Sequence, residues 1–275
     1  MFSISRQLRR EAKTVGFVPT MGALHDGHLS LVKEARATCD IVIVSIFVNP
    51  KQFNDAGDLD KYPRDLTADA ALLAEYEVDY VFAPEEHEIY PDGFATYVDV
   101  EGLVETLEGA SRPGHFRGVT TVVTILFNTI RPDRAFFGQK DAQQIAVIKR
   151  LTTDLGFETE IVVVPTVREE SGLAMSSRNS LLSAEEREKA KVIIEALREA
   201  KLAYKKGERN AADLAQIVTE RMEAEPLAKL DYVAVVDRDT LQTIEKIGDD
   251  EALIVTAVYV GDIRLIDNVI LNRKQ

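Results

Sequence analysis

The sequence has little of what marks several classes of protein. Its single cysteine, Cys39, has no second cysteine with which to form a disulfide within the chain. No apolar run approaches the ~20 residues that a membrane-spanning helix needs, and the first residues lack the apolar core of a signal peptide. The absence of low-complexity tracts argues against disordered, collagen-like and coiled-coil proteins. We therefore expect a cytoplasmic globular protein with no membrane partner.

Positive charge is also scarce. The 275 residues include 33 lysines and arginines against 46 acidic residues, which gives a net charge of -13 and a pI near 4.9. Nucleic acids are bound by basic faces, and no cluster of lysine and arginine offsets this balance, so we expect no nucleic-acid partner. Small anionic substrates remain compatible with the sequence, because a few local cations are enough to bind them.

What the sequence does have is a regular alternation of short apolar runs and helical patterns. The apolar runs are rich in β-branched and aromatic residues, which is typical of buried strands. They are Val15–Val18, Ile41–Val48, Val78–Phe82, Arg134–Phe137 and Ile161–Val164. Helical patterns at His28–Thr38 and Asp141–Leu155 fall between them. This order predicts the α/β class, with a Rossmann-like, doubly wound parallel sheet.

The pattern changes after about residue 168. Ser183 and Glu186 form a predicted capping box that opens a charged helix ending near Gly207, and a second helix is expected from Asn210. Three apolar stretches spaced for antiparallel pairing follow, at Leu230–Val236, Leu253–Val260 and Ile263–Leu271. We therefore predict a Rossmann-like domain over residues 1–168 and a smaller α+β domain over residues 169–275.

The segment Pro19–His28 follows the first predicted strand, at the sheet edge where open α/β sheets bind ligands. Gly22 and Gly27 would let the backbone approach a ligand, and the amides opening the next helix offer positive charge to phosphate oxygens. His25 and His28 add donors that can stabilise charge on a phosphate under attack. A single histidine often only caps or packs a turn, but two flanking Asp-Gly favour a functional pair.

Three further segments at the same predicted edge carry side chains suited to an anionic substrate. Lys140 follows a strand and Gln144 lies one turn later, so both would point toward one ligand, although most lysines are solvated. Arg178 follows two serines in a polar segment that by itself would indicate a linker. Gln52 suits a substrate bearing hydroxyl and carboxylate groups, although Asn49-Pro50 is also typical of a surface turn.

The segment Glu108–Gly118 is rich in glycine and cations and precedes a long apolar run. It indicates either a ligand-covering loop or a structural turn that leads into a buried helix. We expect Phe127, Phe136 and Phe137 to lie in the core and not to form a platform for base stacking.

Six segments appear in the order and with the spacing of one enzyme family: PTMGALHDGH, SIFVNPKQF, YPRDL, LEGASRPGHFRGVTTVV, FFGQKDAQQ and VPTVREESGLAMSSRNSLL. On these residues the chain resembles the pantothenate synthetases over nearly its whole length. The two-histidine and Ser-Ser-Arg segments also resemble the paired signatures of nucleotidyltransferases and class I aminoacyl-tRNA synthetases. Gln139 and Ala142 depart from the family pattern, which more often has glutamate and a bulky residue there.

The resemblance implies a homodimer that condenses pantoate with β-alanine through a pantoyl adenylate. ATP would be cleaved to AMP and pyrophosphate, and Mg²⁺ would be required, with no ligands assigned to it. Residues 1–168 would bind nucleotide and pantoate, and residues 169–275 would form a lid. Gln52 and Gln144 would bind pantoate, with Gln52 also near β-alanine.

The resemblance also implies catalytic and nucleotide-binding residues. His28, Lys140 and Arg178 would be catalytic. The residues expected to bind ATP are Met21, Gly22, Ala23, Leu24, His25, Asp26, Gly27, His28, Gly138, Gln139, Lys140, Asp141, Val167, Met175, Ser176, Ser177 and Arg178.

Three other functions fit parts of the pattern. An adenylyltransferase of the same fold would transfer AMP to a phosphate acceptor, but the two glutamines favour a neutral pocket. A fragment of a tRNA-dependent synthetase is opposed by the net charge, and a nucleotide-binding regulator would not need the histidines, Lys140 and Arg178. One assay separates these functions: AMP formation from ATP that requires both pantoate and β-alanine.

Overall fold

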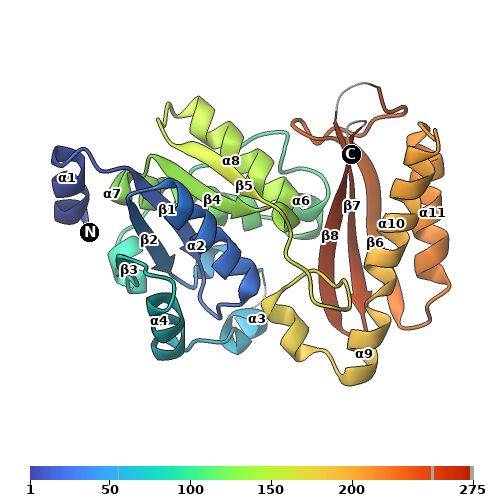
Figure 1. Cartoon of the computed structure of the whole chain (residues 1–275), viewed down its shortest axis with the longest axis horizontal. Coiled ribbons are helices and arrows are strands. Elements are labelled where there is room, and N and C mark those ends of the chain that lie inside the picture. The colour runs from blue at the N-terminus through green and yellow to red at the C-terminus, as the bar shows by residue number, and fades with distance from the viewer. Residues whose placement is uncertain (55, 249–250, 273–275) are drawn as a thin grey trace. The chain divides into compact units, whose positions relative to one another are not determined.

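The computed structural model describes residues 1–54, 56–248 and 251–272. Figure 1 shows the elements along the chain. In chain order they are α1 (Phe2–Arg10), β1 (Val15–Thr20), α2 (Asp26–Thr38), β2 (Ile41–Ile46), η1 (Pro50–Gln52), α3 (Ala56–Lys61), α4 (Leu66–Ala74), β3 (Tyr80–Phe82), α5 (Glu86–Ile89), α6 (Glu108–Ser111), α7 (His115–Ile130), β4 (Arg134–Gly138), η2 (Gln139–Asp141), α8 (Ala142–Asp154), β5 (Glu160–Val164), η3 (Ser177–Leu181), α9 (Ala184–Lys189), α10 (Val192–Lys205), α11 (Ala211–Glu223), β6 (Ala228–Asp237), β7 (Ala252–Val260) and β8 (Ile263–Leu271).

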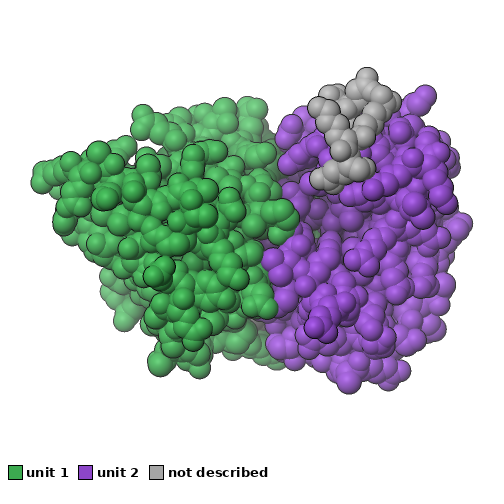
Figure 2. Space-filling view, viewed as in Figure 1, with its two compact units in different colours: residues 1–138, 143–165 green, residues 139–142, 166–275 purple. Residues whose placement is uncertain are grey.

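The chain forms two compact units, coloured separately in Figure 2. Unit 1 contains Met1–Gly138 and Gln143–Pro165, and unit 2 contains Gln139–Ala142 and Thr166–Gln275. The short helix η2 therefore packs with unit 2, although the residues on either side of Gln139–Ala142 belong to unit 1.

Unit 1 is built on a five-stranded sheet in the order β3-β2-β1-β4-β5, in which every described pairing is parallel. Side chains alternate across it: Phe17 and Phe137 lie in a cluster with α1, α7 and α8, whereas Val18 and Phe136 lie in another with α2 and α4. Helices therefore cover both faces, which explains why the strands are apolar throughout. The predicted doubly wound parallel sheet is confirmed, as is the burial of the phenylalanines.

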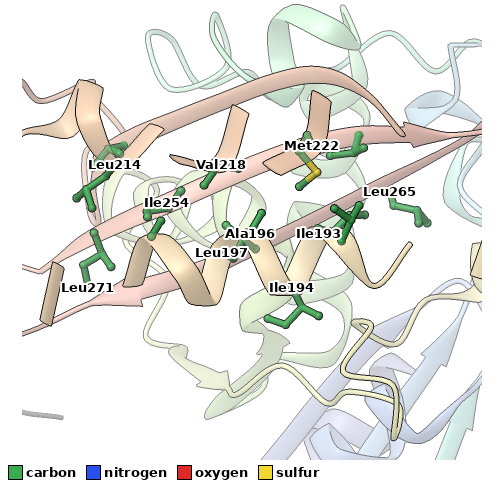
Figure 3. Packing of buried hydrophobic residues seen from close by; sticks show 14 of the residues in the cluster. Ile193, Ile194, Ala196, Leu197, Leu214, Val218, Met222, Ile254, Leu265 and Leu271 are labelled. Carbon is green, nitrogen blue, oxygen red and sulfur yellow. The ribbon is translucent and has the colours of Figure 1, made fainter. Parts of the chain in front are cut away.

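Unit 2 contains a three-stranded antiparallel sheet in the order β6-β7-β8, as the three apolar stretches predicted. Two helices cover one face of it (Figure 3): Leu197 of α10, Val218 of α11 and Ile254 of β7 lie in one cluster and are fully excluded from solvent. Truncating such a leucine to alanine typically costs about 2–5 kcal/mol of unfolding free energy, so this cluster is a major source of the unit's stability.

The predicted capping box at Ser183 is confirmed, since the Ser183 side chain accepts from the Glu186 amide and the Glu186 carboxylate accepts from the Ser183 amide. The single helix predicted from there to Gly207 is wrong, because α9 ends at Lys189 and α10 begins at Val192. Between them the hydrogen bonds tighten to the i+3 pattern, as in the bond from the Ile193 amide to the Ala190 carbonyl of 3.1 Å.

The helix predicted from Asn210 is confirmed, and the Asn210 side chain accepts hydrogen bonds at the N-terminus of α11. Most strands differ from prediction by one or two residues at a boundary; for example, β2 ends at Ile46 and β3 begins only at Tyr80. No helix in the part of the chain that the structure describes is both long and apolar enough to cross a bilayer.

Candidate active site

The segment Met21–His28 follows the central strand β1 and carries both histidines; we call it the histidine loop. The buried Asp69 carboxylate of α4 holds this loop. Asp69, 6% exposed, accepts from the Ala23 amide at 3.0 Å and from the Leu24 amide at 2.9 Å. Gly22 has a φ of 81°, and a Cβ there would lie 2.8 Å from an Asp69 oxygen. Only glycine therefore fits this position without displacing the carboxylate. Ala23 shares the left-handed conformation, with a φ of 51°, so Asp69 holds the loop in a strained path.

His25 and His28 cap the N-terminus of α2 reciprocally. The His25 Nδ1 accepts from the Gly27 amide at 3.1 Å, and the His28 Nδ1 accepts from the His25 amide at 3.4 Å. Their ring centroids lie 4.1 Å apart. Because both Nδ1 atoms act as acceptors, each neutral ring carries its proton on Nε2 and is a donor there. The predicted structural role of capping and the predicted function as donors are thus compatible in the same two side chains.

Gln52 lies at the end of η1, after the neighbouring strand β2, and contacts the histidine loop. Its Nε2 donates to the Sδ of Met21 at 3.0 Å, while its Oε1 accepts from Asn49 Nδ2 at 3.0 Å. Asn49 is 1% exposed and also accepts from the Tyr90 hydroxyl at 2.7 Å. Burial raises the pKa of Tyr90, which keeps this hydroxyl protonated as a donor. The Gln52 amide is therefore fixed with its NH₂ group on the side of Met21.

The start of α7 supports the same turn from its other side. The backbone carbonyl of Gln52 contacts His115 Nδ1 at 2.8 Å and accepts from Arg112 at 3.3 Å. Asn49 donates to the Gly118 carbonyl at 3.0 Å, and a Cβ on Gly118 would lie 2.2 Å from the Lys51 carbonyl oxygen. The segment Glu108–Gly118 therefore consists of α6, a turn over residues 112–114 and the start of α7, which contacts η1, as expected for a structural turn that leads into a buried helix.

Gln144 lies in the first turn of α8 and is partly exposed. The adjacent Gln143 is 5% exposed and fastens the chain before α6: it donates to the Leu103 and Thr106 carbonyls and accepts from the Glu108 amide. The two glutamines thus differ, because Gln143 has all its hydrogen bonds within the fold whereas Gln144 faces partly outward.

In unit 2, η2 is attached to β8 through Asn268. The Asn268 side chain donates to the carbonyls of Gln139, at 2.9 Å, and Lys140, at 3.0 Å, and accepts from the Gln139 side chain at 3.0 Å. This fixes the backbone that carries Lys140, whose Nζ lies 3.6 Å from the Asp141 carboxylate. The side-chain amide of Gln139 is therefore paired with another amide.

A hairpin in unit 2 brings together the predicted residues Val167 and Met175, whose backbones are joined by a hydrogen bond of 3.0 Å. The Arg168 guanidinium forms a bidentate ion pair with the buried Asp267 carboxylate, with N–O distances of 2.6 and 3.0 Å. The Ser176 side chain accepts from the Arg178 amide and caps η3. The segment Met175–Arg178 is therefore an ordered turn and not a linker.

The Glu169 carboxylate anchors the next part of this hairpin. It accepts from Arg187 at 2.7 and 3.0 Å and from Asn179 at 2.7 Å, and these hydrogen bonds, that of Arg187 foremost, lower the pKa of Glu169. Asn179 is 4% exposed and also donates to the Ala174 carbonyl. The carboxylate thus ties the start of the hairpin to η3 and α9.

Two groups of the predicted site residues are thus formed, each within its own unit. Met21–His28 and Gln52 meet in unit 1, where Gln144 and Gly138 also lie. In unit 2 the stretch Gln139–Asp141 contacts β8, and η3, which begins at Ser177, contacts β8 as well.

Residues that orient these groups escaped prediction: Asn49, Asp69, Arg112, His115, Asp267 and Asn268. The signal for Asp69 was an acid among the apolar residues of a helical pattern, and that for Asp267 and Asn268 was a polar pair inside an apolar strand. Among residues 1–54, 56–248 and 251–272, no three histidine, cysteine or acidic side chains gather as a metal cage would require.

Known proteins are similar to this chain over nearly its whole length. The sequence model of the family described as pantoate-beta-alanine ligase matches residues 1–270. A pantothenate synthetase from Heliobacterium modesticaldum is 55% identical over 271 residues, which are 98% of this chain and 96% of that protein.

Solved structures are similar over the same length. That of a pantothenate synthetase from Thermus thermophilus has a TM-score of 0.90 at 47% identity and covers 98% of both chains. That of pantoate-beta-alanine ligase from Francisella tularensis, complexed with beta-gamma ATP and beta-alanine, has a TM-score of 0.79 at 39% identity and covers 98% of this chain and 95% of that chain.

Proposed function

The chain belongs to the pantoate-beta-alanine ligase family and is an enzyme that joins pantoate to β-alanine with ATP as a substrate, and we propose that it does so through a pantoyl adenylate. The observation that carries this proposal is the contact of Gln52 with Met21, which joins the expected pantoate-binding residue to the histidine loop within one unit. Ligation needs activation of a carboxylate beside a nucleotide, and this contact supports a shared site for the two substrates.

The first half-reaction makes the carboxylate reactive. A carboxylate resists attack by an amine because its leaving group would be oxide, so a pantoate oxygen first attacks the α-phosphorus of ATP and pyrophosphate leaves. His28 donates from Nε2 to phosphate oxygens as their charge builds, and Lys140 and Arg178 add positive charge. The remaining residues predicted to bind ATP hold the nucleotide in line for this attack.

The second half-reaction uses the adenylate. The β-alanine amine attacks the pantoyl carbonyl, the bond to the phosphate oxygen breaks, AMP leaves with the electron pair, and the amide nitrogen loses a proton to water. Gln52 and Gln144 hold pantoate during both steps through hydrogen bonds to its hydroxyl and carboxylate groups, and Gln52 also lies near the amine. Because the Gln52 oxygen already accepts from Asn49, its NH₂ group is the part that contacts an anionic substrate.

Mg²⁺ fits this chain as an ion bound largely by phosphate oxygens and water, because the described residues offer no cage of three or more acidic, histidine or cysteine ligands. When bound, it neutralises charge on the leaving pyrophosphate. The homodimer, the cytoplasmic location, the division at residue 168 and the lid role of residues 169–275 are further parts of this proposal that rest on the family resemblance and the composition.

Exchange of labelled pyrophosphate into ATP tests the adenylate. We expect exchange that requires pantoate but not β-alanine, and AMP release that requires both. Exchange without pantoate, or AMP release with a phosphate acceptor in place of β-alanine, would refute the proposed route and favour another adenylyltransferase reaction. The variant Arg150→Gln, on an exposed part of α8 and paired with Asp154, serves as a control whose rates should equal those of the unchanged protein.

A further inference from the structure

Unit 1 contains a hollow lined partly by arginines, at the end of its strands opposite the histidine loop. It is a pocket of about 500 Å³ between α1 and the end of α7. The residues that line it are Phe2, Ser5, Arg6, Arg9, Thr129 and Arg131. Its volume falls in the ~300–1,000 Å³ range of small-molecule sites.

The pocket is distinct from the site described above. Arg131 lies just before β4 and α1 lies before β1, whereas Met21–His28 follows β1. The strands are parallel, so these segments lie at opposite ends of strands that are five or six residues long. Such strands span roughly 16–20 Å at ~3.3 Å per residue. A small molecule in this pocket therefore does not touch the histidine loop.

Three arginines surround one pocket of a chain whose net charge is -13. Arg9 lies 3.4 Å from the exposed Glu158 carboxylate. For the side chains of Arg6 and Arg131 the described part of the chain offers no recorded carboxylate partner. Guanidinium groups that share a pocket repel one another, and a bound anion removes that repulsion.

Arg131 has an unusual backbone conformation. It ends α7 in the left-handed conformation, with a φ of 54° and a ψ of 57°, where glycine or asparagine is usual. An arginine there costs about 1–2 kcal/mol in backbone strain. A cation also favours the C-terminal end of a helix, and Arg131 supplies one to α7, whose last turn has no lysine or arginine.

Phe2 defines the other part of the ligand. It is a large apolar side chain that is 54% exposed, and the surface of the pocket is mostly apolar although three of its residues are arginines. Phe2, Ser5, Arg6 and Arg9 follow the i, i+3, i+4, i+7 spacing, so α1 presents ring and guanidinium groups on one face. The helix is fixed in place, because the buried Ser5 hydroxyl donates to the Thr129 carbonyl at 3.0 Å.

We propose that this pocket binds an organic phosphate, with the phosphate held by Arg6, Arg9 and Arg131 and an aromatic or apolar group packed on Phe2. The site is non-catalytic. The ligand's phosphate supplies the oxygens that the guanidinium groups pair with, and its organic part covers the exposed ring.

The absence of tryptophan from the sequence allows a local reporter. The variant Phe2→Trp places the single indole at the pocket, so its fluorescence reports binding there and not in the nucleotide site. We expect a saturable change with phenyl phosphate, a weaker response to inorganic phosphate, and weakening of both by added salt. Equal affinity for the two probes would overturn the aromatic part of the proposal.

Charge variants in this background test the guanidinium groups. Arg131→Asn removes the charge and relieves the strain of the left-handed backbone. Arg6→Gln removes the charge and keeps a good helix former. Misfolding therefore does not explain a loss of phenyl phosphate binding. Each should weaken phenyl phosphate binding about tenfold or more, the usual loss of a charged hydrogen bond. Arg10→Gln, on the same helix but outside the pocket, is the matched control.

Three outcomes would overturn the proposal. In the first, the fluorescence of the Phe2→Trp protein shows no saturable change, and equilibrium dialysis finds the same number of phenyl phosphate sites in the unmodified and the Arg131→Asn proteins. Another is equal weakening by Arg10→Gln, which would show only a general effect of charge. The third is a shift of the sedimenting species on Arg6→Gln, which would make this face a contact between copies of the chain.

Discussion

Asp69 offers the sharpest test of how unit 1 builds its site, because one carboxylate holds the strained loop that carries the histidines. Replacing it by alanine removes both acceptors, to the Ala23 and Leu24 amides. A hydrogen bond to a charged group contributes about 1.5–3 kcal/mol, so Asp69→Ala should lower the free energy of unfolding by about 3–6 kcal/mol. Water reaching the partly exposed loop in the variant would move the result toward the lower end.

The same change should slow adenylation. Ala23 is released from its left-handed conformation, and the loop relaxes by an amount on the order of an ångström, which can cost about 10²-fold in rate. The measurements are urea unfolding and pantoate-dependent exchange of pyrophosphate into ATP. Asp65→Ala is the matched control: Asp65 caps the same helix α4 through the Ala68 amide and has no recorded contact with the loop, so it should cost about 1 kcal/mol of stability and leave exchange unchanged.

The reasoning fails if Asp69→Ala lowers stability but exchanges pyrophosphate at the normal rate, because the carboxylate would then support the fold without orienting the site. It also fails if Asp65→Ala slows exchange equally, because the loss would then come from α4 as a whole.

Four other predictions follow from the site. His28→Ala should slow adenylate formation by roughly 10²-fold or more, measured in a single turnover, because one oriented donor is lost. Gly118→Ala should raise the KM for pantoate more than it lowers kcat, because the added Cβ would lie 2.2 Å from the Lys51 carbonyl oxygen and displace Gln52. Asn268→Ala should weaken the binding of a non-hydrolysable ATP analogue, measured by calorimetry, because the backbone of η2 loses its two donors from β8. Glu169→Gln should be less stable than the unchanged protein near neutral pH, and the difference should disappear in acid, measured by urea unfolding at several pH values. The sign follows from the lowered pKa of Glu169: its stabilisation is complete above the unfolded value of about 4.5 and is lost as the pH falls through the folded pKa.

Each of these predictions has an outcome that contradicts it. A single-turnover rate within a few-fold of normal for His28→Ala would remove the histidine from the chemistry. A normal KM in Gly118→Ala would mean that the turn yields without moving Gln52. Unchanged analogue binding by Asn268→Ala would show that η2 keeps its position without β8, and a stability difference for Glu169→Gln that persists in acid would show a cause other than ionisation.

Much of the fold follows from local patterns. The parallel strands could be predicted because both faces are buried, which makes each strand a continuous apolar run such as that of β2. The capping box at Ser183 was likewise visible as two residues at fixed spacing. The break between α9 and α10 was not, because Ala190 and Lys191 are ordinary helix formers and the interruption is a change in hydrogen bonding alone.

The candidate site was predictable only in part. Residues of unusual type at strand ends, such as His25 and Gln52, were indicated by their positions. Asp69 and Asn268 were not, because each acts on backbone groups distant in sequence, and the distance between Asp69 and the loop is set only when α4 packs on the sheet. Side chains that orient other groups carry no local signature.

The assignment of residues 139–142 to unit 2 limits how this protein can be divided into fragments. The chain leaves unit 1 after Gly138, returns after Ala142 and leaves again after Pro165, so no single cut yields both units whole. A fragment of residues 166–275 would keep Asn268 but lose the carbonyls that its amide serves. A truncation or a domain exchange at a single boundary therefore removes residues 139–142 from unit 2. Any fragment or exchange of that unit must include these residues.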